Sequence, residues 1–217
     1  MVDQALLPAI EATIRQNEIG NTSPYQLSFA RKGQSGASFG FMQGDTNVSS
    51  LARATLTQVL AAAGVDQGTY DPILAALSHP LPNGDTLSIP DTALVNNALS
   101  APTGRPIVDA MDQALLGVVL TGLDSCVAAA SAGGLTLAPI AFLYIAPWIN
   151  MSGAPHLLNT WLGGAAVHGV PPPTPPTVKG SDVAAYLQSM AYFQANPRNF
   201  AHFEQCVQAG AAQLPPA

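Results

Sequence analysis

The chain has 217 residues, a length that fits one domain with its own hydrophobic core. Apolar residues make up 48% of it, which excludes an intrinsically disordered chain, while charged residues make up only 9%. The formal net charge is −6, and the seven Lys and Arg residues are scattered along the sequence. Because no basic stripe is available to neutralise phosphates, nucleic acid is not expected as a partner.

Helical patterns dominate the chain and predict a mainly α, α+β fold. Residues 4–17 place apolar side chains near one face, and Asp3 is the predicted N-cap. Residues 51–65 repeat the helical spacing, with Gly64 as the predicted stop. The other predicted helices are a short one from Asp71-Pro72, one from Pro90-Asp91, a long one over residues 103–120 with the apolar run after it, one over residues 153–167, one capped by Ser181, and the last from Asn196-Pro197.

Residues 21–47 lose the helical period. Tyr25, Leu27 and Phe29 alternate, residues 32–36 are rich in turn formers, and residues 37–45 combine aromatic residues with glycines. This pattern predicts a β-hairpin or a small three-stranded sheet near residues 24–45. If residues 37–45 form one strand, successive side chains point to opposite faces of the sheet. Phe41, Gln43 and Asp45 then lie on one face, and Ser38, Gly40 and Met42 on the other.

Residues 125–152 contain no charged residue and are long enough to span a bilayer. Gly133-Gly134, Pro139 and Pro147 interrupt this run, and no Lys or Arg flanks it as an anchor. We therefore expect a buried helix pair rather than a stable membrane span. Asp124, directly before the run, is expected to pair with a backbone amide or an Arg. A membrane-associated structural protein without enzymatic activity is the alternative.

The cysteines and histidines do not form a metal-binding pattern. Cys126 and Cys206 lie far apart in the sequence, so two buried free thiols are expected, with a single disulfide as the alternative. None of the histidines pairs at metal-ligand spacing, so neither a metal nor a cofactor is expected. The Pro-rich segment PPPTPP is interpreted as part of a loop at residues 169–177 within a single domain of residues 1–217.

Glu18 is the strongest candidate for acid catalysis. It is one of three glutamates, and it ends the first predicted helix directly before the predicted hairpin, where a cleft is expected. An apolar neighbour such as Ile14 would raise the pKa of the carboxyl group, which is the condition for a general acid near neutral pH. The alternative is a solvated glutamate at a helix end.

A short motif in the predicted hairpin adds to this interpretation. Gly40-Phe41-Met42-Gln43 resembles the Gly-Leu-Met-Gln signature of lytic transglycosylases and goose-type lysozymes. The order of a helix ending in Glu18 and then a glycine-rich hairpin is similar to phage-type lysozymes. The resemblance covers residues 10–60, and it has departures: Ile19 stands where transglycosylases usually have Ser, and no Asp lies between Glu18 and Asp45.

The resemblance implies a divergent lysozyme-like domain that cleaves bacterial cell-wall peptidoglycan, a β-1,4-linked amino-sugar glycan, as a hydrolase or a lytic transglycosylase. Glu18 would protonate the leaving oxygen, and Asp45, Gln43 or Ser38 would position water or stabilise the transition state. Asp45 has an equal alternative as a cap of the next helix. The predicted sugar-binding residues are Tyr25, Phe41, Met42, Asn150 and Asn159, and Tyr25 has packing of the hairpin as its alternative role.

The N-terminal residues lack the pattern of a secretory signal. We therefore expect a monomer made in the cytoplasm that reaches the cell wall after release or export, as an endolysin or a delivered effector does. The acidic net charge disfavours attraction to an anionic cell wall. A chitosanase-like glycosidase acting on a cationic glycan is consequently the enzymatic alternative.

Overall fold

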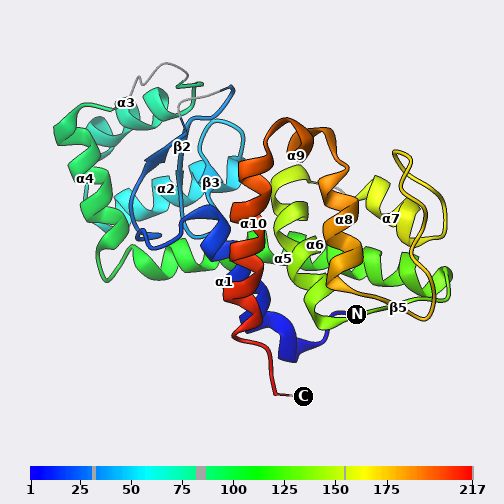
Figure 1. The fold of residues 1–217 in the computed structure, drawn as a ribbon. Coiled ribbons are helices and arrows are strands. Elements are labelled where there is room, and N and C mark those ends of the chain that lie inside the picture. Colours follow the sequence, from blue (N-terminus) through cyan, green and yellow to red (C-terminus); the bar gives the residue numbers. More distant parts are fainter. Residues whose placement is uncertain (31–32, 82–86, 154, 217) are drawn as a thin grey trace. The chain divides into compact units, whose positions relative to one another are not determined.

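The computed structural model describes residues 1–30, 33–81, 87–153 and 155–216, and Figure 1 follows the chain through its helices and strands. The described residues are mostly helical and contain a small antiparallel sheet, which confirms the mainly α, α+β class. The chain forms two compact units: unit 1 is Met1–Gly20 with Leu116–Ala217, and unit 2 is Asn21–Leu115. A single domain over residues 1–217 stays a prediction.

Unit 1 is built from helices and one pair of short strands. A 3-10 turn over Gln4–Leu6, capped by Asp3 as predicted, leads into its first helix. Its elements are α1 (Leu7–Glu18), the second part of α5 (Arg105–Ala132), β4 (Thr136–Leu137), α6 (Pro139–Ser152), α7 (His156–Leu162), β5 (Thr177–Val178), α8 (Gly180–Gln188), α9 (Ala191–Ala195) and α10 (Pro197–Ala211). The parallel pairing of β4 with β5 was not predicted from the sequence.

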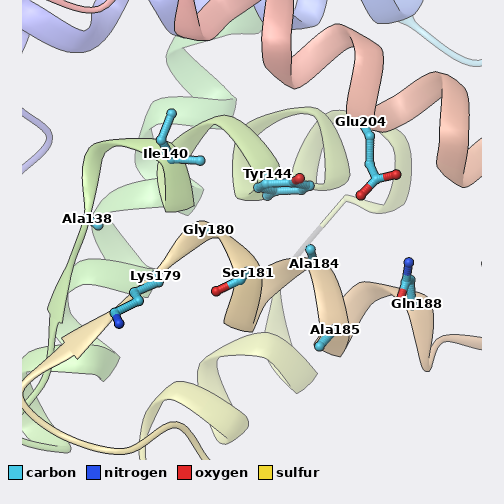
Figure 2. A pocket seen from close by; sticks show the side chains of 10 residues that line it. All are labelled: Ala138, Ile140, Tyr144, Lys179, Gly180, Ser181, Ala184, Ala185, Gln188 and Glu204. Carbon is cyan, nitrogen blue, oxygen red and sulfur yellow. The ribbon is translucent and has the colours of Figure 1, made fainter.

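Close helix packing holds unit 1 together. Helix α1 packs against α10, and α6 packs against both α1 and α8. Small residues allow these approaches: a Cβ atom on Gly210 would lie 1.8 Å from Thr13 Oγ1, and one on Gly180 would lie 2.3 Å from Ile140 Cγ2. Figure 2 shows Gly180 at the start of α8, beside α6. The apolar side chains of α6, including Leu143, are buried within this unit.

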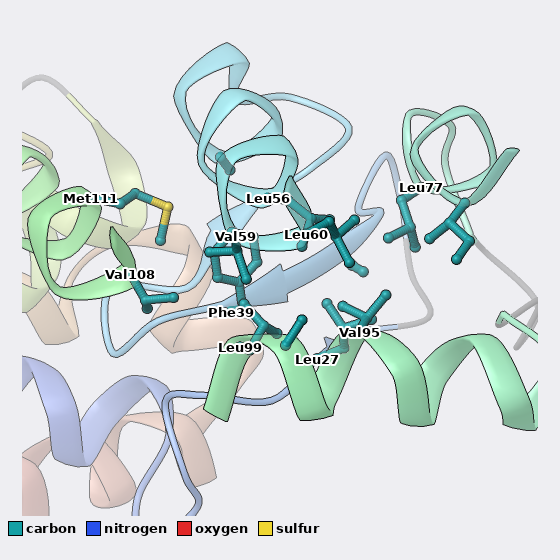
Figure 3. Packing of buried hydrophobic residues seen from close by; sticks show 14 residues of the cluster. Leu27, Phe39, Leu56, Val59, Leu60, Leu77, Val95, Leu99, Val108 and Met111 are labelled. Carbon is teal, nitrogen blue, oxygen red and sulfur yellow. The ribbon is translucent and has the colours of Figure 1, made fainter. Parts of the chain in front are cut away.

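Unit 2 packs helices against a three-stranded sheet. Antiparallel strands β1 (Ser28–Phe29), β2 (Ala37–Phe39) and β3 (Gly44–Asp45) lie in chain order, and α2 (Ser50–Ala62), α3 (Gln67–Leu77), α4 (Ile89–Ser100) and the first part of α5 complete the unit. Figure 3 shows the core, in which Phe39 of the sheet lies among side chains of α2, α4 and α5. This core therefore uses the apolar spacing that the sequence showed over residues 51–65.

The predicted small sheet near residues 24–45 is confirmed, but residues 37–45 do not form one strand. Residues 40–43 form a turn in which Gly40 (φ 79°) and Gln43 (φ 52°) are left-handed. Ser38 and Asp45 are therefore direct cross-strand partners, and their side chains share a face. The predicted alternation, with Ser38 on the face opposite Asp45, is wrong because the turn interrupts it. The segment rich in turn formers, residues 32–36, is the predicted hairpin tip, and its first residue, Lys32, lies outside the described residues.

Several predicted helix limits are also wrong. The helix predicted over residues 153–167 covers only α7, His156–Leu162. Helix α3 begins at Gln67 rather than at Asp71-Pro72, because the Asp66 side chain accepts the Thr69 amide and caps the helix a turn earlier. Lys179, not Ser181, is the N-cap of α8, and its amide donates to Asp182. The segment after Ser181 forms two helices, α8 and α9, instead of one.

The uncharged run over residues 125–152 forms two helices, the end of α5 and α6. The expectation that both are buried holds only for α6, since Cys126 and Ala130 are the buried residues of the α5 part. Helix α5 ends before Gly133-Gly134, and α6 begins at Pro139. Asp124 accepts the Val2 amide at 2.6 Å, which confirms a backbone partner. Within the described residues, α5 is the one helix long and apolar enough to cross a membrane; a window of it has a mean hydropathy of 1.7 and is 28% buried. Length and composition of this kind also occur in core helices of soluble proteins.

Candidate functional site

Glu18 is positioned by the end of α1. The buried residues Ile10 and Ile14 lie on the same face of the helix, two turns and one turn before it. Gly20 then takes a left-handed conformation (φ 55°), and its amide donates to the Arg15 carbonyl, which ends the helix. The local sequence therefore places Glu18 half-buried at the terminus of a helix whose apolar face packs into unit 1.

Two amide side chains hold the Glu18 carboxyl group. Asn17 Nδ2 and Asn150 Nδ2 each donate to Glu18 Oε1 at 2.9 Å. Asn150 comes from α6, 132 residues further along the chain, so the structure brings together two of the residues predicted from the sequence. Because both donors use Oε1, a proton on the neutral carboxyl group is placed on Oε2.

The environment raises the pKa of Glu18 above its usual value. Burial is the largest cause because it disfavours the charged form, and the hydrogen bonds from Asn150 and Asn17 oppose it by stabilising the anion. The net direction is upward, as the sequence analysis expected from the apolar surroundings. A carboxyl group of this kind remains protonated at a higher pH than an exposed one, which suits a general acid.

Glu18 borders a pocket of about 280 Å³ within unit 1. Tyr192, at 43% exposure, lies at this pocket, and its hydroxyl oxygen accepts a hydrogen bond from Asn199 Nδ2 at 3.0 Å. The other lining side chains are Asn17, Met151, Phe193, His202 and Phe203. The pocket thus combines one carboxyl group with neutral polar and aromatic surfaces. Sequence reasoning missed Tyr192, Asn199 and His202, since no local spacing links them to Glu18.

A buried thiol contacts His202 of this pocket. Cys206 Sγ is 3.5 Å from His202 Nε2, and burial, followed by the charge of Glu18, raises the pKa of Cys206 to about 11. Burial likewise raises the pKa of Cys126 to about 12. Both cysteines are free and buried, which confirms the predicted pair of thiols. Thiols with such pKa values stay protonated near neutral pH and are poor nucleophiles.

Asp45 belongs to unit 2 and binds the backbone around it. Its carboxylate accepts the Gly36 amide at 3.1 Å and the Asn47 amide at 2.8 Å. The next helix, α2, is capped by Ser49, whose hydroxyl oxygen accepts the Ala52 amide, so the prediction that Asp45 caps this helix is wrong. Glu18 belongs to unit 1, and the two carboxylates predicted as a pair therefore lie in different units. A catalytic role for Asp45 stays a prediction.

Ser38 and Gln43 also lie within the hairpin network. Gln43 Oε1 accepts the Ser28 hydroxyl, and Gln43 Nε2 donates to the Gly40 carbonyl at 2.9 Å. Ser38 is buried in β2, between Ser28 and Asp45 in register. The structure therefore brings Ser38, Gln43 and Asp45 together, and it uses the Gln43 and Asp45 side chains to bind atoms of the same small sheet.

The motif Gly40-Phe41-Met42-Gln43 forms a turn anchored by Asp112 of α5. The buried Asp112 carboxylate accepts the amides of Phe41 at 2.8 Å and Met42 at 3.0 Å. A Cβ atom on Gly40 would lie 2.3 Å from Asp112 Oδ1, so this position requires glycine. The Phe41 and Met42 side chains are 5% and 4% exposed, which leaves little surface for a sugar. Asp112 was not singled out in the sequence because its partner lies 70 residues away.

Tyr25 and Asn159 occupy other surroundings. The Tyr25 hydroxyl donates to Asp109 at 2.8 Å, the Arg105 guanidinium lies 5.1 Å from its ring centroid, and the ring packs against the core of unit 2. These contacts favour the packing role. Asn159 in α7 donates to the Ser125 hydroxyl at 3.0 Å, and it is not part of the described lining of the Glu18 pocket.

Within the described ranges, no group of three or more His, Cys, Asp or Glu side chains is arranged to hold a metal ion. No protein-family model, curated protein or solved structure matches the chain. The geometry of the Glu18 pocket is therefore the basis for a functional assignment.

Proposed function

We propose that the Glu18 pocket is the catalytic site of a glycosidase that cleaves the β-1,4-linked amino-sugar glycan of the bacterial cell wall. The observation that carries this proposal is a half-buried carboxyl group with a raised pKa, held on one oxygen by two amides and facing a pocket. The exposed ring of Tyr192 offers a surface on which a sugar can stack. The partial resemblance to lytic transglycosylases and lysozymes points to the same chemistry.

In the proposed reaction, Glu18 acts first as an acid and then as a base. Its Oε2 proton passes to the glycosidic oxygen as the bond from that oxygen to the anomeric carbon breaks, through an oxocarbenium-like transition state. The carboxylate then takes a proton from the hydroxyl that attacks the anomeric carbon, either water or a hydroxyl of the same sugar. Among the described residues lining the pocket, Glu18 is the one carboxyl group, which favours this route over a carboxylate pair.

Replacing Glu18 by Gln tests the proposal directly. We expect glycan cleavage, followed as turbidity loss of permeabilised cells, to fall by about 10²–10⁴ because the acid is lost. Glu11→Gln is the matched control, since it removes a carboxylate from the same helix away from the pocket and should retain wild-type activity. Circular dichroism checks folding. Activity above about 10% of wild type in a folded Glu18→Gln variant would rule out an essential acid.

Two asparagines provide a finer test of the site. Asn150→Ala removes a donor that lowers the pKa of Glu18, so we expect about tenfold lower activity and a basic limb of the pH–activity profile at higher pH. Asn159→Ala is the control, because Asn159 lies in the same unit but donates to the Ser125 hydroxyl. This variant should leave the pH–activity profile unchanged. Equal profiles for the two variants would mean that Asn150 does not act through Glu18.

The products and substrates separate the alternatives. Mass spectrometry of released fragments distinguishes hydrolysis, which yields reducing ends, from transglycosylation, which yields sugars lighter by one water. The net charge of −6 and a described pocket lining without Lys or Arg favour a cationic glycan as the second candidate substrate. Cleavage of chitosan without cleavage of peptidoglycan would establish that alternative.

A further inference from the structure

A second pocket lies in unit 1, between α6, α8 and α10, and has a volume of about 560 Å³ (Figure 2). It shares none of its described lining residues with the Glu18 pocket. The ring of Tyr144 projects from α6 toward α8, and Ala184 and Ala185 of α8 also belong to the pocket lining. The middle of this groove is therefore largely apolar.

The two ends of the groove carry opposite charges. Figure 2 shows Lys179 and Ser181 at the start of α8, and Glu204 of α10 toward the other end, beyond Tyr144 and near Gln188. In the described part of the chain, neither Lys179 nor Glu204 forms an ion pair. Both charged groups are therefore available to a ligand. The pKa of Tyr144 is raised, first by burial and then by the Glu204 charge, so its hydroxyl remains a neutral donor.

The length of α8 gives the span from Lys179 to Gln188, the lining residue near which Figure 2 shows Glu204. Nine residue steps separate Lys179 from Gln188, which corresponds to about 13 Å at the helical rise. An extended peptide spans about 3.3–3.6 Å per residue. A chain of three or four residues therefore covers this distance, whereas a single amino acid does not.

We propose that this groove binds a short peptide of three or four residues with both termini free, its carboxylate at Lys179 and Ser181 and its ammonium group at Glu204. Small side chains suit the apolar middle, where the two alanines and the Tyr144 ring leave a shallow surface. The opposite charges give the ligand a direction, because the reversed peptide would place like charges together. This site is separate from the Glu18 pocket and does not rest on the glycan proposal.

Calorimetric titration of the full chain with tri-alanine and tetra-alanine tests this inference at low salt. We expect saturable binding that weakens as salt is added, since exposed charges are screened. Peptides with an acetylated N-terminus or an amidated C-terminus, and alanine alone, should each bind about tenfold more weakly or not at all. These blocked peptides test the groove on the unaltered protein.

Charge-neutral variants test which residues bind which end. Lys179→Gln should weaken tri-alanine binding about tenfold and remove the effect of C-terminal amidation, and Glu204→Gln should do the same for N-terminal acetylation. Arg198→Gln and Glu11→Gln, which change charges outside this lining, are the matched controls and should bind as wild type. No saturable binding, or binding unchanged in both groove variants, overturns the inference. Loss of glycan cleavage in Glu18→Gln is independent of either result.

Discussion

Asp45 and Asp112 of unit 2 differ from Glu18 of unit 1 in how their carboxyl groups are bound. In unit 2, Asp45 and Asp112 accept backbone amides of the loops beside them, so their oxygen atoms hold the sheet and the turn in place. In unit 1, Glu18 accepts the side-chain amides of Asn17 and Asn150 and borders a pocket. The comparison teaches that Asp45 and Asp112 serve the fold through backbone donors, whereas Glu18 is held on one oxygen by side chains beside a pocket.

The same contrast extends to packing. Unit 1 depends on close helix contacts around the buried helix α6, while unit 2 surrounds a small sheet whose loops are tied by side-chain oxygens. We therefore expect unit 1 to be most sensitive to changes in apolar packing and unit 2 to changes in its polar anchors. The following variants test this contrast.

Leu143→Asp should have the largest effect. Leu143 is fully buried in α6, and a carboxylate there would have no partner, so we expect a loss of about 4 kcal/mol or more in the free energy of unfolding. Leu157→Asp, at a position that is 52% exposed in α7, is the control and should change it by about 0.5 kcal/mol or less. Thermal melting measures both. An unchanged melting temperature for Leu143→Asp would mean that α6 is not the core of unit 1.

Gly40→Ala should destabilise unit 2 by about 3 kcal/mol. The substitution forces alanine into a left-handed conformation and displaces the Asp112 carboxylate from two buried amides. Gly33→Ala is the matched control. Its φ is also positive, but among the described residues a Cβ atom there meets no atom within 4 Å, so the backbone strain of about 1–2 kcal/mol is the expected cost. Equal losses in urea denaturation would show that the Asp112 anchor contributes little.

Asp45→Asn should cost about 1 kcal/mol and leave glycan cleavage close to wild type. One oxygen of the asparagine can still accept the backbone amides that Asp45 accepts, but the charge that strengthens these bonds is lost. Denaturation and the turbidity assay measure the two effects separately. A fall in activity as large as that of Glu18→Gln, in a folded protein, would instead make Asp45 the second catalytic carboxylate.

The smallest expected effect is a pH dependence of stability from Glu18. Its folded-state pKa lies above the ordinary value of 4.5, so the folded state binds the proton more tightly than the unfolded state. The free energy of unfolding should therefore fall as the pH rises from about 4.5 through the raised pKa. Glu18→Gln should lack this decrease, whereas Glu11→Gln should keep it. Parallel stability curves for wild type and Glu18→Gln would contradict the raised pKa.

The sequence by itself determined the features that depend on neighbouring residues. Apolar spacing predicted α1 and α2, because a helical face is formed by residues three and four apart. The glycines and prolines of residues 125–152 predicted the break between α5 and α6, since these residues end or begin helices. The sequence likewise predicted that Glu18 ends the first helix and that the two cysteines are free thiols.

Tertiary structure alone decided the contacts between distant residues. The motif at residues 40–43 reads as a strand, but Asp112 binds its amides and it forms a turn. Asn150 was singled out with other polar residues, yet only the packing of α6 against α1 brings it to Glu18. The pairing of β4 with β5, and the approach of Tyr192 and His202 to the same pocket, depend on the chain path in the same way. Periodicity describes one element at a time, whereas these contacts join elements whose arrangement is set by the whole core.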